Sequence, residues 1–198
     1  MSTSSALPRS RKPWPWRACG GEDLFAPAWH SARNRWPWLF VNLITAFVAT
    51  RFIGLFESTI QELVALATLM PIVASIGGNT GNQTVALVIR ELAYEQLTDD
   101  SRRLLLRKEV LVSLLNGLIW EGMVGLIAGL VYTRARLGMV MTGAIMLNLV
   151  IAADVGVLVP LALQRAGRDP AKRSSVLSTF ITDSMGFFLF LGLARLFL

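Results

Sequence analysis

The sequence is poor in the residues that build soluble enzymes and disulfide-bonded proteins. It has one cysteine, Cys19, and one histidine, His30, and only 16% of its 198 residues are charged. One cysteine excludes an internal disulfide framework. One histidine excludes a His-rich zinc site and argues against a Ser-His-Asp hydrolase. A soluble domain carries about 25% charged residues, so this composition argues against one.

Apolar residues dominate instead. They make up 54% of the chain, and the mean hydropathy is +0.54. Disordered proteins need low hydrophobicity, so disorder is excluded for most of the chain. A net charge of +6 would suggest nucleic acid in a soluble protein, but in a membrane protein it indicates basic cytoplasmic loops. The predicted partner is therefore a lipid bilayer and not a nucleic acid.

Residues 1–35 have no apolar run that could serve as a signal peptide. We interpret them as a cytoplasmic arm, with a short interfacial helix over Leu24–Arg35 and an unstructured tail as the alternative for residues 1–22. Aromatic side chains suit the headgroup region, and the arm and its boundary carry Phe25, Trp29, Trp36 and Trp38.

Five long apolar segments occupy the remaining residues, 36–198, and predict an all-α integral membrane domain. A spanning helix needs about 20 residues, and helices satisfy their own backbone groups in lipid. The segments are 39–56, 60–92, 110–131, 139–163 and 176–198.

The second segment is too long for one straight span. Its 33 residues would reach roughly 50 Å as a helix, against a hydrocarbon core of about 30 Å. It contains Pro71 and the run Gly77–Gln83, which weaken a helix. We therefore predict a helix that is broken or bent at these two places, with its end projecting into the cytoplasm.

The basic residues predict the orientation, because cytoplasmic loops are rich in Lys and Arg. A cytoplasmic N-terminus and five spans put the C-terminus outside and 15 of the 19 basic residues inside. The four left near the outer face are Arg51, Arg134, Arg136 and Arg195.

Acidic residues inside apolar segments are the sharpest functional signal, because a charge at mid-span costs about 2.5–3.5 kcal/mol. Asp183 shares a helix face with Thr179, and such oxygen groups suit a hard cation; structural hydrogen bonding is the alternative. Glu109 opens the third segment, where it could bind an ion or stabilise the helix end. Glu121 and Asp154 could bind a cation, carry protons or bond a neighbouring helix.

The run Gly77-Gly78-Asn79-Thr80-Gly81-Asn82-Gln83 adds neutral oxygen donors, including the amides of Asn79 and Asn82. A permeating ion should meet such groups, because its binding must be loose enough for exit. Packing by small residues is the alternative, and it explains the glycines but not the amides. Copper or zinc would need thiolate or imidazole ligands, and one cysteine and one histidine, both in the arm, cannot provide such a site. Composition and spacing thus predict a membrane protein that handles a hard cation.

The stretch from Met70 to Gln83 resembles the signature of the MgtE family of magnesium channels, a Pro followed after five residues by Gly-Gly-Asn-x-Gly-x-Gln. The resemblance covers about residues 33–198, including Lys108-Glu109 and Thr182-Asp183. It implies a homodimer with one pore on its two-fold axis, built around Asp183 and the backbone oxygen of Thr179. It also assigns the pore wall or further Mg²⁺ sites to Gly78, Asn79, Asn82 and Glu109.

Typical family members also carry N-terminal and CBS domains that sense Mg²⁺ and close the pore. About 35 residues precede the first span here, so we expect that form of gating to be absent. Such a channel would be ungated, regulated by a separate protein or driven by ion coupling.

The expected function is therefore movement of hydrated Mg²⁺ across the cytoplasmic (inner) membrane, with Mn²⁺ or Co²⁺ as further cargo. A Na⁺- or H⁺-coupled exchanger using Glu121 or Asp154 is the main alternative. An intramembrane aspartic protease built on Asp154 and Asp183 is disfavoured because no protease motif surrounds either. A purely structural subunit is disfavoured because it has no need for the glycine-amide run.

Overall fold

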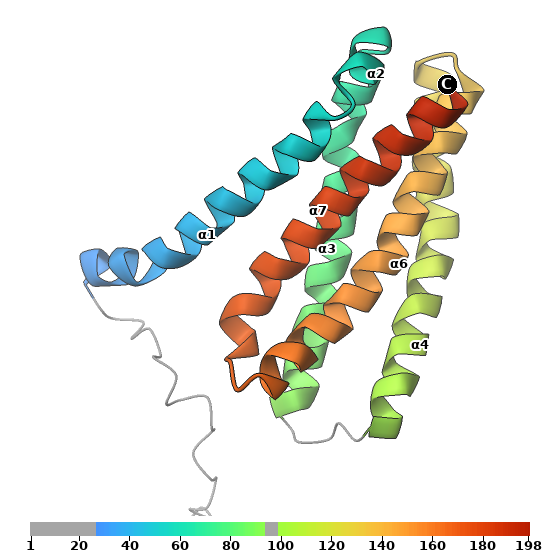
Figure 1. Ribbon diagram of the computed structural model, residues 1–198. Coiled ribbons are helices and arrows are strands. Elements are labelled where there is room, and N and C mark those ends of the chain that lie inside the picture. Colours follow the sequence, from blue (N-terminus) through green and yellow to red (C-terminus); the bar gives the residue numbers. More distant parts are fainter. Residues whose placement is uncertain (1–26, 94–98) are drawn as a thin grey trace, which may run out of the picture.

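The computed structural model describes residues 27–93 and 99–198, and these residues form helices and connecting turns without any strand. The all-helical class predicted from the sequence is therefore confirmed. Figure 1 shows the long helices running side by side in alternating directions. The elements are α1 (Ala28–Gly54), α2 (Glu57–Glu62), α3 (Ala65–Ala93), α4 (Asp99–Asn116), the π-helical turn η2 (Gly117–Glu121), α5 (Gly122–Val131), α6 (Ala135–Arg165) and α7 (Pro170–Phe197).

Four helical stretches within the described residues are long and apolar enough to cross a membrane. They are Ala28–Gly54, Arg102–Val131, Ala135–Arg165 and Arg173–Phe197. The second of these runs without interruption through α4, η2 and α5. At 29 residues α3 is long enough, but with its polar run it is not among these four stretches. The structure thus supports four of the five predicted spans on length and composition.

The start of α1 differs from the expected boundary between arm and membrane domain. Residues 28–35 continue directly into the long helix, which includes Pro37. Proline removes one backbone donor and bends a helix, and the first turns of α1 lie at an angle to the rest (Figure 1). Residues 1–26, which hold most of the proposed arm, lie outside the described residues.

The predicted break in the second segment is wrong. The chain turns earlier, at Leu63, where φ is −138° and ψ is 88°, and α3 then runs continuously through Pro71 and all of Gly77–Gln83. Neighbouring helices can compensate for a proline inside a membrane bundle. The physical role of the glycines is also different from the one expected, because they allow close packing.

Asn148 of α6 shows this packing at the centre of the bundle. Its side chain is fully buried and lies against Gly77 of α3 and Gly186 of α7. A Cβ atom at Gly77 would overlap the Asn148 amide, and one at Gly186 would lie 2.7 Å from its Nδ2 atom. Small residues at a crossing let helix backbones approach closely. The glycine run therefore packs α3 onto α6 and α7 without breaking α3.

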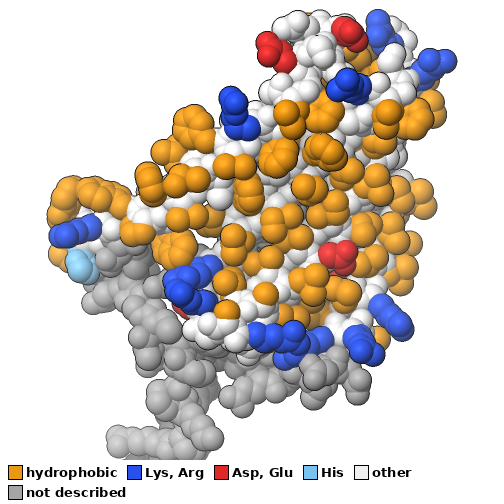
Figure 2. All heavy atoms as spheres, viewed as in Figure 1, with side chains coloured by type: hydrophobic (Ala, Val, Ile, Leu, Met, Phe, Trp, Pro, Cys, Tyr) orange, Lys and Arg blue, Asp and Glu red, His pale blue; other side chains and the backbone are white. Residues whose placement is uncertain are grey.

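The core follows the same three helices, with fully buried side chains that include Leu66, Val73, Met141, Ile145 and Phe190. The outer surface is also largely apolar, as Figure 2 shows for one face, with basic side chains gathered toward both ends. A bundle that is apolar outside as well as inside suits a lipid environment.

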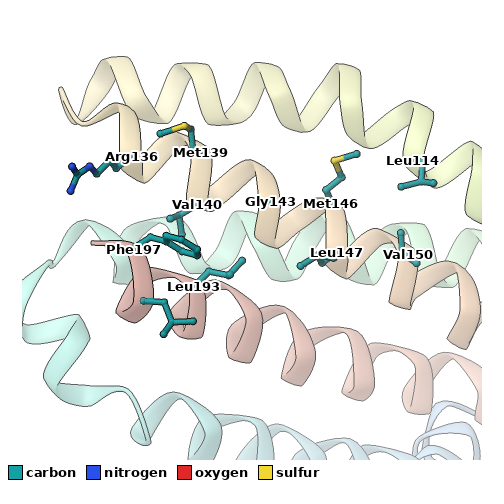
Figure 3. Close-up of a pocket in the computed structure, with 11 residues that line it drawn as sticks. Leu114, Arg136, Met139, Val140, Gly143, Met146, Leu147, Val150, Leu193 and Phe197 are labelled. Carbon is teal, nitrogen blue, oxygen red and sulfur yellow. The ribbon is translucent and has the colours of Figure 1, made fainter.

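An apolar groove of about 850 Å³ runs along the outer side of α6 between α4 and α7 (Figure 3). One end carries Arg136, and the remaining lining includes Met139, Met146, Leu147, Leu193 and Phe197. Cations such as Mg²⁺ need oxygen ligands. This groove is therefore not a candidate ion path.

Candidate functional site

The candidate site lies where α3 packs along α7. Gly78 of α3 faces Asp183 of α7: a Cβ atom on Gly78 would lie 3.6 Å from the Asp183 Oδ1 atom. Gly78 is itself buried, so the backbone of α3 approaches the carboxylate closely at this point. Asp183 itself is half-buried. The contact places an acidic oxygen beside the glycine-amide run, 105 positions away in the chain.

Asn82 joins the same two helices one turn further along α3. Its Nδ2 atom donates to the Thr179 hydroxyl at 3.2 Å, and its Oδ1 atom accepts from the Ser175 hydroxyl at 2.9 Å. Ser175, Thr179 and Asp183 are spaced by four residues and so share one face of α7. The result is a row of oxygen groups on α7 held in register with α3 by one amide.

The open face of α3 is also polar beside this row. Ser75, Asn79 and Gln83 recur at helical spacing and are exposed in this single chain. Polar side chains are costly against lipid and normally face a protein interior or water. This stripe therefore needs a partner chain or an aqueous path.

Glu109 does not join Asp183. It lies on α4 against the opposite side of α3, where it is 8% exposed and its Oε2 atom accepts a hydrogen bond from Thr84 at 3.0 Å. Of the six residues predicted as ligands, Gly78, Asn82, Thr179 and Asp183 therefore come together. Asn79 lies beside them on the open stripe, and Glu109 is separate.

Glu121 accompanies Glu109 in a cavity of about 700 Å³ between α3 and the α4–η2–α5 helix. It is 3% exposed, and its Oε2 atom has no hydrogen-bond partner among the described residues. From the sequence, Glu121 is recognisable only as an acidic residue in the middle of a predicted span. It could not show the π-helical turn that ends at this residue, since the turn depends on packing.

Asp154 is placed differently. It is half-buried on α6, and Leu147 and Leu158, which share its helix face, are 48% and 55% exposed. Its side chain therefore belongs to the outward face of the bundle.

The donors at the α3–α7 site are oxygens, which suits a hard cation. No cluster of three or more His, Cys, Asp or Glu side chains exists in the described ranges 27–93 and 99–198. A single chain thus offers one carboxylate surrounded by hydroxyl and amide oxygens. Such a set fits an ion that keeps most of its water, as Mg²⁺ does.

Comparison with known proteins places this site in a family. Residues 70–193, which contain the whole α3–α7 site, match the family described as MgtE, divalent cation transporter. The chain belongs to the MgtE family. This confirms the resemblance noted in the stretch from Met70 to Gln83.

Relatives of known name support the assignment. The magnesium transporter MgtE of Bacillus subtilis (strain 168) is 30% identical over 91% of this chain and 41% of its own length. That of Thermus thermophilus is 36% identical over 81% of this chain and 36% of its own length. The magnesium transporter MgtE of Enterococcus faecalis is 27% identical over 85% of this chain and 37% of its own length. The chain therefore spans about two fifths of the length of these MgtE relatives.

Proposed function

We propose that this protein conducts Mg²⁺ across the cytoplasmic membrane, with Asp183 as the carboxylate that attracts the ion. The observation that carries the proposal is the Gly78–Asp183 contact, which places a half-buried carboxylate of α7 beside the hydroxyl and amide oxygens that join α3 to α7. The names of the relatives, all magnesium transporters, support Mg²⁺ as the cargo. Mn²⁺ and Co²⁺ are similar hard or borderline ions and are proposed as weaker substrates.

We propose further that the pore forms between two copies of the chain. The exposed polar stripe on α3 would be costly against lipid, and a two-fold axis along it would turn it into a shared aqueous path. Two copies of Asp183 would then face the same ion. The pair supplies enough charge for a divalent cation, which one carboxylate does not.

The proposed topology has five crossings, with the N-terminus in the cytoplasm and the C-terminus outside. The 29 residues of α3 span about 43 Å, more than the hydrocarbon core. The ends of α3 lie at the same levels as those of its neighbours (Figure 1). Its polar residues are acceptable at membrane depth because the bundle and the proposed pore cover them.

The decisive experiment is Mg²⁺ uptake into proteoliposomes by the Asp183→Asn variant. Removing a charged contact costs about 1.5–3 kcal/mol, which corresponds to a roughly ten- to hundred-fold loss of flux. Asp154→Asn is the matched control, because it neutralises an intramembrane acid on the outer face of α6. Wild-type flux in Asp183→Asn, with a normal elution profile, would refute the role of Asp183.

Coupled exchange is the second candidate function, and the buried carboxylate of Glu121 is the observation that favours it. A coupled exchanger accelerates when a Na⁺ or pH gradient is imposed in the correct direction. Passive flux that ignores both gradients would eliminate this candidate and leave the channel.

A further inference from the structure

The cavity beside Glu109 is separate from the α3–α7 site. Its lining from α3 includes Thr80, Thr84 and Leu87, whereas Gly78 and Asn82 contact α7. Residues advance about 100° each around a helix, so these two sets lie on opposite sides of α3. Gln83 of the exposed α3 stripe also lines this cavity, so the cavity borders the proposed pore. An ion beside Glu121 would nevertheless lie across α3 from Asp183.

The π-helical turn explains how Glu121 comes to face the same cavity as Glu109. Twelve residues of regular α-helix would rotate Glu121 about 120° away from Glu109. A π-helical turn holds one extra residue, which removes about 100° of that rotation. Glu121 therefore takes the position that continues the stripe of Glu109, Ser113 and Asn116, and all of these residues line the cavity.

The charge on Glu121 is not balanced by a basic side chain from the lining. Lys108 is the basic residue that lines the cavity, and it is thirteen residues away along the helix, or roughly 20 Å. A buried carboxylate whose Oε2 atom has no hydrogen-bond partner among the described residues is costly unless a cation or proton neutralises it. The volume of about 700 Å³ would hold roughly twenty waters, so a hydrated cation fits.

We propose that this cavity is a second, off-pore site for a hydrated divalent cation, with Glu121 as its inner carboxylate and Glu109 at its cytoplasmic mouth. Hydroxyl and amide groups of Thr80, Ser113 and Asn116 add neutral oxygen donors to a lining that also contains apolar side chains. A mostly hydrated ion needs only one or two carboxylates and tolerates neutral donors around its waters. The ion's identity rests on the proposed function, but the existence of the site does not.

The test measures Mn²⁺ binding by electron paramagnetic resonance in the detergent-solubilised Asp183→Asn protein, at high ionic strength to screen surface charges. This background removes the pore carboxylate. We expect Asp183→Asn to retain a bound Mn²⁺, and the added change Glu121→Gln to weaken that binding about ten-fold or more. Adding Asp154→Asn instead should leave the binding unchanged.

Two results would overturn the proposal. One is Mn²⁺ binding that is equal with and without Glu121→Gln, which would mean that Glu121 carries a proton. The other is the loss of all binding in Asp183→Asn alone. If Glu121→Gln does not fold, Glu121→Ala replaces it, and unchanged affinity in that variant, which has no carboxylate, counts against the site. Failure of the proposed function appears separately, as wild-type transport by Asp183→Asn.

Discussion

Gly156 of α6 offers a sharp test of how the bundle positions Glu109. A Cβ atom at Gly156 would lie 2.6 Å from the Cβ of Thr84 and 3.0 Å from the Gly81 carbonyl oxygen, both on α3. Neither neighbour is the free end of a flexible side chain. Gly156→Ala must therefore push α3 and α6 apart, and it displaces the residue whose hydroxyl binds Glu109.

The matched control lies on the same helix. A Cβ atom at Gly143 would meet nothing within 4 Å. Both substitutions gain the same helix propensity, about 1 kcal/mol. Overpacking costs typically about 1–3 kcal/mol and applies to Gly156→Ala alone. The two variants should therefore differ by about 1–3 kcal/mol, or roughly 2–12 °C in Tm for a chain of this length.

The assay is thermal unfolding of both purified variants in the same detergent, followed by Mg²⁺ uptake. We expect Gly143→Ala to match or exceed the wild type in Tm and to transport normally. Gly156→Ala should melt lower and lose uptake, because the shift of α3 disturbs the hydrogen bonds of Asn82 to α7. Equal Tm values for the two variants would refute the close α3–α6 contact.

Three further predictions concern the site and its support. Asn82→Ala removes two hydrogen bonds to α7 and should lower the free energy of unfolding by about 1–3 kcal/mol. A double-mutant cycle of Asn82→Ala with Ser175→Ala should give a coupling energy of about 0.5 kcal/mol or more, and strict additivity would count against the Ser175–Asn82 hydrogen bond. Phe56→Ala removes a buried ring that packs edge-on against Phe188 at 5.8 Å and should cost about 3–5 kcal/mol in denaturant unfolding, whereas a cost below 1 kcal/mol would contradict this packing. Mg²⁺ at a hundred-fold excess over Kd should stabilise the wild type by about 2.7 kcal/mol, a gain that chelation reverses and that Asp183→Asn reduces.

Much of the architecture could be predicted from apolar length alone. A spanning helix has to be long and uncharged, so the helices around 110–131, 139–163 and 176–198 are recognisable in the sequence. The neighbourhood of Thr179 and Asp183 follows from their spacing of four residues. Both features depend on residues that are close together in the chain, so the order and spacing of residues in the sequence are enough to predict them.

The errors share a different cause. A glycine in the sequence can mark either a break in a helix or a place where another helix packs closely. At Gly77 the second reading is correct, because the side chain of Asn148 on α6 lies where a Cβ atom would be. The π-helical turn before Gly122 likewise depends on tertiary packing, so the shared cavity of Glu109 and Glu121 could not be foreseen. Predictions failed where a residue's role depends on a helix distant in sequence.

The weak packing of α1 against the other helices has a consequence for the stability of the bundle. This helix packs mainly along α7, and its apolar stretch is only 6% buried. Few contacts are lost if α1 detaches, so the packing of α3, α6 and α7 should survive its separation. The cohesion of the described bundle therefore rests on α3 to α7, and α1 adds little to it.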